Sequence, residues 1–436
     1  SSGGNGGTGG GGDSGILNNG GKKHTGGGGG GGADDGNNYT AGDGGSGIVI
    51  IKSVIDAVSI GPETTLSETS IAKQFIYDEN GYTDAMFSEG SETQSIRLSS
   101  DGLAMALGDG NYSSNNGRLY YYERSSISDT FTKTHTFDAV SSGLEFGASV
   151  DMNAAKTRIA ISGSDADNSA SATGRVYIYD RASTSASWPS SPTATITPPA
   201  STIKRFGHTV NMSDDGLTMI TSGDAANSTA NESGVYVYEY ASGSWSKTFE
   251  VTQGISRFGF KVAMNKTGTR FIAGGTNTAY YVYHKVSGTW SSTVQLTGAT
   301  GYHCGMSPDG NTVAVGIVQY SSNLGRVAVY KYSGNSWGSV VNIDTTVGSG
   351  TYQIGNTPVF NNDGTLLVTG CSAYNSYMGC FEIWKYESGS WVFKKQFLNP
   401  TVKTGHGNDT GEFFGGYLSM DYAGTSVIVS NPGNDV

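Results

Sequence analysis

The sequence has few charged residues, few cysteines and no long hydrophobic run. Only 14% of its 436 residues are charged, and the formal net charge is −11. Binding to nucleic acid through phosphate neutralisation needs a basic face, so this acidic balance argues against a nucleic-acid partner. Attraction to an anionic membrane surface is disfavoured for the same reason. Because no stretch reaches about 18 apolar residues, we expect no membrane insertion.

The start of the chain lacks a secretion signal. It begins at Ser1, and no basic segment followed by an apolar one opens it. We interpret the sequence as a processed product or as one ordered part of a longer protein.

Three cysteines are too few to staple a chain of this length, so the fold must rest on its secondary structure. Cys371 and Cys380 flank one loop, on two segments expected to pair as a hairpin. A disulfide between them is geometrically plausible and would suit an extracellular or virion setting. Two buried free thiols are the alternative. Cys304 has no evident partner.

Motifs of the common catalytic and cofactor sites are also missing. The six histidines are scattered, and the adjacent pair His303-Cys304 has no second pair at zinc spacing. The sequence contains no Gly-x-Ser-x-Gly elbow, phosphate-binding loop or dinucleotide fingerprint. We therefore expect no cofactor and no enzymatic activity.

What the sequence does contain is one phrase that returns about every 50 residues, which indicates a supersecondary unit copied several times. In its clearest copy, Phe206-Gly207 opens the unit and Asp215-Gly216 forms a turn. Gly234-Val235-Tyr236-Val237-Tyr238 and Ser242-Gly243-Ser244-Trp245 follow. Each copy holds four short alternating strands separated by turn residues, which is the content of one propeller blade.

Six complete copies can be counted, and a seventh opens at Phe414-Gly415 but ends after two strands. Phe75-Ile76-Tyr77, near the other end of the chain, reads like the missing outer half. We predict an all-β, seven-bladed β-propeller of four-stranded antiparallel blades, in which N-terminal strands close the last blade. This closure would remove two open sheet edges. A ring that continues beyond Val436 is the alternative.

Residues 1–47 are almost entirely Gly, Ser, Asn, Asp and Thr, and a flexible linker is the default interpretation. The segment ends in Gly44-Gly45-Ser46-Gly47-Ile48-Val49-Ile50-Ile51-Lys52, which resembles the glycine-rich domains of bacteriophage tail-fibre adhesins and related virion proteins. The resemblance implies glycine tracts packed as extended helices, since only glycine permits very close backbone packing. We divide the chain into a glycine-rich stalk or joint (1–52), a linker (53–70) and the propeller (71–436).

The Phe-Gly opening, the Asp-Gly turn and the Gly-x-Val-Tyr-Val-Tyr strand together resemble the FG-GAP repeat family, which includes the integrin α-subunit propeller. The resemblance implies an extracellular recognition or adhesion module without catalysis. Short turns such as Ser307-Pro308-Asp309-Gly310 replace the family's calcium loop. Calcium is therefore not favoured there, and Asp-Gly suits a hairpin turn with positive φ.

Two further sets of polar residues are candidates for a metal site and for a catalytic site. Asp165, Asp167 and Asn168 form the best remaining Ca²⁺ candidate, although Asx-turn hydrogen bonding is the favoured interpretation. Charged residues just before the blade openings could face the ring axis, as in propeller glycosidases and sialidases. They suit solvated charges equally well: Glu145, Arg205, Arg257 and Glu412.

Tryptophans recur at one blade position, which predicts packing between blades: Trp245, Trp290, Trp337 and Trp391. Ligand recognition is better sought on one face of the ring. The loops between second and third strands, together with the loops that enter each blade, share this face, which we name the loop face. They are long and variable, and rigid scaffolds usually carry recognition in such loops. The candidate ligand-binding residues are Tyr112, Tyr302, Tyr320, Tyr374 and Tyr377.

The sequence thus predicts a non-enzymatic recognition or adhesion module at an extracellular or virion surface, such as the head of a fibre or spike. Its expected partners are a host-surface glycan or protein and other subunits of a fibre. A structural subunit of an extracellular filament or sheath, without a soluble ligand, is the first alternative. A propeller carbohydrate hydrolase is the second.

Overall fold

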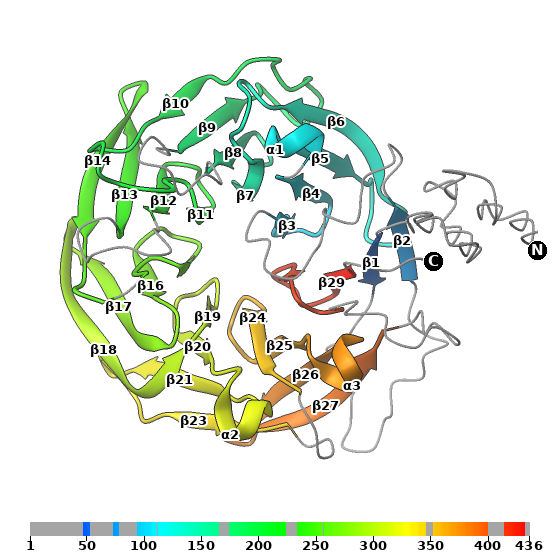
Figure 1. Ribbon diagram of the computed structural model, residues 1–436, viewed down its shortest axis with the longest axis vertical. Helices are drawn as coiled ribbons and strands as arrows, with labels where there is room; N and C mark the ends of the chain where they lie inside the picture. Colours follow the sequence, from blue (N-terminus) through cyan, green and yellow to red (C-terminus); the bar gives the residue numbers. More distant parts are fainter. Residues whose placement is uncertain are drawn as a thin grey trace, which may run out of the picture.

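The computed structural model describes residues 47–52, 73–77, 94–110, 112–164, 174–223, 233–255, 257–345, 352–399 and 414–431. Within these ranges the chain forms seven antiparallel sheets, six with four strands and one with five. Figure 1 shows the sheets around a ring in a propeller-like arrangement. The all-β class expected from the sequence is confirmed.

Six of the sheets use strands that follow one another along the chain. The first sheet contains β3 (Gln94–Leu98), β4 (Ala104–Asp109), β5 (Arg118–Glu123) and β6 (Thr132–Asp138). The second contains β7 (Phe146–Met152), β8 (Arg158–Gly163), β9 (Arg175–Asp180) and β10 (Ala194–Ile196). The third contains β11 (Val210–Met212), β12 (Thr218–Gly223), β13 (Gly234–Ala241) and β14 (Ser244–Val251). The fourth sheet contains β15 (Lys261–Met264), β16 (Arg270–Gly274), β17 (Thr278–Val286) and β18 (Thr289–Gly301). The fifth contains β19 (His303–Met306), β20 (Thr312–Gly316), β21 (Val327–Ser333), β22 (Ser336–Trp337) and β23 (Val341–Ile343). The sixth contains β24 (Ile354–Phe360), β25 (Leu366–Cys371), β26 (Cys380–Glu387) and β27 (Ser390–Leu398). Three helical turns follow second strands: α1 (Tyr112–Asn115), α2 (Tyr320–Asn323) and α3 (Tyr374–Tyr377).

The seventh sheet joins the two ends of the described chain, in the order β28 (Leu418–Met420), β29 (Ser426–Asn431), β1 (Gly47–Lys52) and β2 (Lys73–Tyr77). β1 pairs with β29 from Gly47 opposite Asn431 to Lys52 opposite Ser426. The strand that ends the glycine-rich segment therefore lies inside a sheet built with C-terminal strands. Because β29 has a partner on each side, it presents no open edge.

The Phe-Gly opening is a close contact between neighbouring sheets. A Cβ on Gly370 would lie 1.8 Å from the carbonyl oxygen of Gly415, and one on Gly108 would lie 1.9 Å from that of Gly147. Both glycines of each pair are therefore required by the approach of two backbones. The phenylalanines that open four repeats are at most 1% exposed: Phe146, Phe206, Phe258 and Phe414.

Hydrophobic clusters join neighbouring sheets around the described ring. Each of the seven clusters takes side chains from two adjacent sheets. The cluster between the seventh and first sheets packs Ile428 of β29 against Leu98 and Met105. The tryptophans at the repeated position all belong to or pack on such clusters, which confirms that they pack between sheets: Trp245, Trp290, Trp337 and Trp391.

Backbone hydrogen bonds connect the turns that follow the first strands, on the side opposite the loop face. The amide of Asn362 donates to the Tyr422 carbonyl (2.8 Å), and the amide of Tyr422 donates to the Ser100 carbonyl (2.9 Å). The latter bond joins the seventh sheet to the first. Equivalent bonds occur at four other junctions: Ala154 to Asp214, Asp214 to Lys266, Lys266 to Pro308, and Asp309 to Asn362.

Candidate recognition surface and axial cavity

Two of the helical turns on the loop face share one sequence. α1 and α2 both read Tyr-Ser-Ser-Asn, and in each case one further residue precedes a Gly-Arg pair, Gly117-Arg118 or Gly325-Arg326. α1 follows the second strand of the first sheet and α2 that of the fifth. Figure 1 shows them on opposite sides of the ring.

In α2 the tyrosine lies on an arginine that is itself held in place. The guanidinium of Arg326 is 3.7 Å from the centre of the Tyr320 ring. Its Nε and Nη2 donate to the carboxylate of Asp344 at 2.6 and 2.7 Å. The hydrogen bond and charge of Asp344 raise the pKa of Arg326, so the cation persists. A bidentate ion pair and a cation–π contact therefore fix a ring that is 39% exposed.

A similar arrangement occurs at α1, although there the arginine contacts only Oδ1 of its aspartate. The guanidinium of Arg118 lies 3.9 Å from the centre of the Tyr112 ring, and its Nε donates to Asp138 at 2.6 Å. We name these two groups, Tyr112 with Arg118 and Asp138, and Tyr320 with Arg326 and Asp344, the Tyr–Arg–Asp stacks.

The backbone of these turns is strained. Ser321, Ser322 and Asn323 have φ of +48°, +58° and +68°. Left-handed geometry costs a non-glycine residue about 1 kcal/mol or more. The turn is held because the amides of Tyr352 and Gln353 donate to the Asn323 carbonyl at 3.0 and 2.9 Å. Such strain tends to occur at functional sites.

The other tyrosines expected on the loop face are placed differently. Tyr374 of α3 lies 5.1 Å from Tyr352, measured between ring centres. Cys380 stands where the stacks have arginine, so Tyr374 has no guanidinium behind it. Tyr302 is half-buried between β18 and β19, and the Tyr377 side chain lies outside the described residues. Among the candidate tyrosines whose side chains the structure describes, only Tyr112 and Tyr320 thus share one geometry.

The arginines and aspartates of the stacks were not identified as site residues from the sequence. The repeated string Tyr-Ser-Ser-Asn-x-Gly-Arg was an available signal, because it occurs twice at the same position of the repeat. The aspartates gave no such signal: Asp138 is the last residue of β6, and Asp344 directly follows β23.

The proposed disulfide is not formed, which corrects one of the two interpretations left open by the sequence. Cys371 and Cys380 are buried free thiols. Burial raises the pKa of the Cys371 thiol well above its usual value.

The metal candidate Asp165, Asp167 and Asn168 lies outside the described residues. In the part of the chain that the structure describes, no group of three or more His, Cys, Asp or Glu side chains could hold a metal ion. Asp101 illustrates how the turns use their carboxylates: its Oδ1 accepts hydrogen bonds from Ser99 Oγ at 2.6 Å and from the Leu103 amide at 3.0 Å.

Three of the charged residues before the blade openings are described, and they do not line the axis. Glu145 is buried and accepts a hydrogen bond from Ser164 at 3.3 Å. Arg205 is also buried, and the Arg257 guanidinium lies over the Phe260 ring, 4.2 Å from its centre. None of these three lines the axial cavity described next. Glu412 lies outside the described residues.

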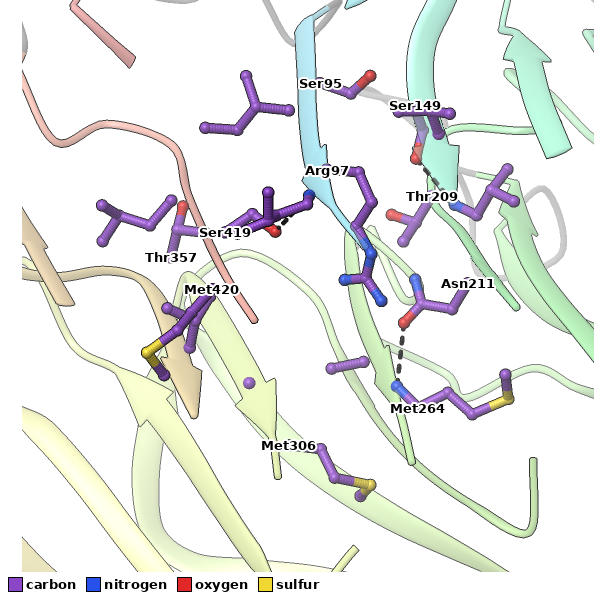
Figure 2. A pocket seen from close by; sticks show the side chains of 18 of the residues that line it. Ser95, Arg97, Ser149, Thr209, Asn211, Met264, Met306, Thr357, Ser419 and Met420 are labelled. Atoms are coloured by element: carbon purple, nitrogen blue, oxygen red, sulfur yellow. Dashed lines mark hydrogen bonds between the residues drawn. The ribbon is translucent and has the colours of Figure 1, made fainter. Parts of the chain in front are cut away.

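A cavity of about 240 Å³ lies where the first strands of all seven sheets meet, and we name it the axial cavity. Figure 2 shows side chains from several of these strands converging on it. Polar groups line its wall, including Arg97 and Asn211, together with three methionines, Met264, Met306 and Met420.

Two hydrogen bonds cross the axis on the turn side of the cavity. Tyr422 Oη donates to Asp214 Oδ1 at 2.6 Å, and Lys266 Nζ donates to Asn362 Oδ1 at 2.9 Å. Each bond joins two sheets that are not neighbours. They bridge the ring on this side, so a ligand would enter the axial cavity from the loop face.

No protein-family model matches the chain, and no curated protein matches it. The resemblance to FG-GAP repeats therefore rests on the repeated residues alone, and the resemblance to virion glycine-rich domains rests on the glycine-rich segment alone. Among the described residues, no helix is long and apolar enough to cross a membrane.

Proposed function

We propose that the chain is a non-enzymatic recognition module whose loop face binds a host-surface glycan at an extracellular or virion surface. Its architecture would be a closed, seven-bladed β-propeller of the FG-GAP type, with the last blade completed by N-terminal strands. The seven sheets, the cluster between each neighbouring pair, and the pairing of β1 with β29 support this architecture.

The observation that carries the proposal is the duplicated Tyr–Arg–Asp stack. Each arginine covers one face of its tyrosine and leaves the ring fixed and accessible. A fixed tyrosine offers a large contact area at little entropic cost on binding. The neighbouring carboxylates can accept hydrogen bonds from sugar hydroxyls, because the Asp138 and Asp344 side chains are 66% and 54% exposed.

Charge narrows the ligand class. Each guanidinium is neutralised by its aspartate, and the whole chain carries a net charge of −11. An acidic glycan would therefore gain little attraction and meet repulsion at longer range. A ring that already has a cation on one face is also a poor site for a second cation. A neutral sugar, whose C–H face can stack on the ring, suits the stacks best.

The glycine-rich segment fits the role of a stalk or joint in this proposal. The sequence places residues 1–46 immediately before β1, which pairs with β29. A chain attached there would connect the ring to other subunits of a fibre.

A glycan array with the whole chain tests the proposal, with alanine substitutions of Tyr112 and Tyr320 as the site variants. Val286→Ala is the matched control, because Val286 is 58% exposed on the face of the ring opposite the loop face. We expect the double tyrosine variant to lose array binding while its melting temperature stays that of the wild type. Undiminished binding by the double variant would refute the proposal. Hydrolysis of a bound glycan would instead favour a hydrolase.

A further inference from the structure

We propose that the axial cavity is a second binding site, separate from the Tyr–Arg–Asp stacks, and that its ligand is a small carboxylate with a short apolar body. The inference does not depend on the proposed function of the loop face. It rests on how the innermost strands satisfy their backbone hydrogen bonds.

The first strand of each sheet has no strand partner on the side that faces the axis. Its backbone amides on that side therefore need other hydrogen-bond acceptors. Side chains of the neighbouring sheet supply them. Ser419 Oγ accepts from the Leu98 amide at 2.9 Å, and Asn211 Oδ1 accepts from the Met264 amide at 3.0 Å. Ser149 Oγ accepts from the Val210 amide at 2.9 Å. Figure 2 shows these three bonds around the cavity.

These bonds consume acceptors and leave donors. A hydroxyl that accepts an N–H keeps its own proton to donate, and an amide whose oxygen is used keeps its two N–H groups. Figure 2 shows Asn211 with its oxygen toward Met264 and its nitrogen on the side of Arg97. Ser149, Asn211 and Ser419 therefore present donors to the cavity.

Arg97 adds a cation at the same level. Its side chain is 40% exposed, and its Nε lies 2.7 Å from Asp151 Oδ1. The remaining guanidinium N–H groups are further potential donors. Asp151 offers little to a ligand, because its two oxygens also accept from the amides of Met152 at 2.7 Å and Met212 at 2.9 Å. A second carboxylate, Asp214, also lines the cavity, and its Oδ1 accepts from Tyr422 Oη at 2.6 Å. Both acidic residues near Arg97 are thus engaged by protein groups.

Hydrogen-bonding groups differ between two levels of the cavity, where a level means one position along the first strands. Arg97, Asn211 and Ser419 hold matching positions in their first strands, where two other sheets have only Ala263 and Gly305. The small residues leave room beside the donors. Ser95 and Thr357 lie two positions earlier in their strands, closer to the loop face. Their hydroxyls donate to the carbonyls of Gly147 and Gly416, each at 2.8 Å. At the deeper level, Arg97, Asn211 and Ser419 therefore present donors to the cavity, and Ser149 presents one at the level of Ser95 and Thr357.

A ligand that suits this wall has several acceptors, little need to donate, and a size below about 240 Å³. A carboxylate meets these requirements, whereas a neutral polyol would leave its own hydroxyl protons without acceptors. Met264, Met306 and Met420 line the same cavity. Methionine adapts to irregular apolar shapes, so these side chains suit the short hydrocarbon part of such an acid.

The test is a thermal-shift titration of the whole chain with butyrate and benzoate, at constant ionic strength set with sodium chloride. Butyramide has nearly the same shape as butyrate but no charge, and inorganic phosphate is an anion without an apolar body. We expect at least one carboxylate to raise the melting temperature saturably, as a ligand of the native state must. Butyramide and phosphate should not do so.

Asn211→Asp is the most informative variant, because it retains an oxygen for the Met264 amide but replaces the donor with a negative charge. We expect it to weaken carboxylate binding at least tenfold. Asn335→Asp adds the same charge on an exposed outer hairpin and should leave binding unchanged. If Asn211→Asp is poorly folded, Arg97→Lys tests the site, since it keeps a cation beside Asp151 but removes the guanidinium donors. The proposal is overturned if no carboxylate shifts the transition, if phosphate alone does, or if the folded site variant binds like the wild type.

Discussion

Substitution of Gly316 by alanine should destabilise the ring through a clash between two backbones. Gly316 ends β20, and a Cβ at this position would lie 1.8 Å from the carbonyl oxygen of Gly355 in the next sheet. Real Cβ contacts essentially never fall below 3.0 Å, so the two sheets would have to separate by more than about 1 Å.

This separation would open a packed cluster. Val327, Ile354 and Leu367 lie in the cluster between these two sheets, and each is fully buried. Overpacking of a tight core costs about 1–3 kcal/mol, and here neither contacting atom belongs to a flexible side chain. We therefore expect a loss of about 3 kcal/mol in the free energy of unfolding. In a chain of this size that corresponds to a fall of about 3 °C in melting temperature.

Gly254→Ala is the matched control. No heavy atom lies within 4 Å of the Cβ that it would add, and its φ is not in the left-handed region. The control should change the free energy of unfolding by less than about 0.5 kcal/mol. Thermal unfolding of both variants, followed by circular dichroism and calorimetry, makes the comparison. The explanation of the paired glycines at the sheet junctions would be refuted if Gly316→Ala melted like Gly254→Ala.

Two other predictions concern charge and ring closure. Glu382 is fully buried and accepts hydrogen bonds from Thr345 at 2.9 Å and Trp384 at 3.0 Å. Burial raises its pKa, so the protonated form is favoured in the folded state and its contribution to stability is lost as pH rises through that raised value. Glu382→Gln should therefore gain melting temperature relative to the wild type as the pH rises above about 4.3, the usual pKa of a glutamate. Parallel melting curves for the two proteins would contradict the sign. Deletion of residues 1–52 removes β1 and exposes the edge of β29. We therefore expect a lower melting temperature, and association of the shortened chain on size-exclusion chromatography. A monomer as stable as the full chain would count against a closing role for β1.

Much of the fold was visible in the sequence because the repeat records backbone requirements. The Phe-Gly openings and the glycines that end second strands mark places where two backbones approach too closely for a Cβ, as at Gly370 and Gly415. The Asp-Gly turns need positive φ, and Gly216 and Gly310 have φ of +70° and +76°. Such constraints allow only one or two residue types, so they appear as a regular pattern.

The sites were less visible because they depend on side chains from distant segments. Arg326 pairs with Asp344 and covers Tyr320 across a turn in which Ser321 and Ser322 adopt left-handed geometry, for which serine has no special preference. The bond from Tyr422 to Asp214 joins residues 208 positions apart. No local pattern predicts that two turns will meet across an axis.

The central claim is that the Tyr–Arg–Asp stacks bind a glycan. Its most direct test is the dissociation constant of the strongest array ligand, measured by isothermal titration calorimetry for three proteins. These are the wild type, the Tyr112→Ala/Tyr320→Ala double variant and Val286→Ala. Central aromatic contacts typically contribute about 2 kcal/mol or more, so we expect the double variant to bind at least tenfold more weakly, and Val286→Ala to bind like the wild type. Equal dissociation constants for all three proteins would contradict the account.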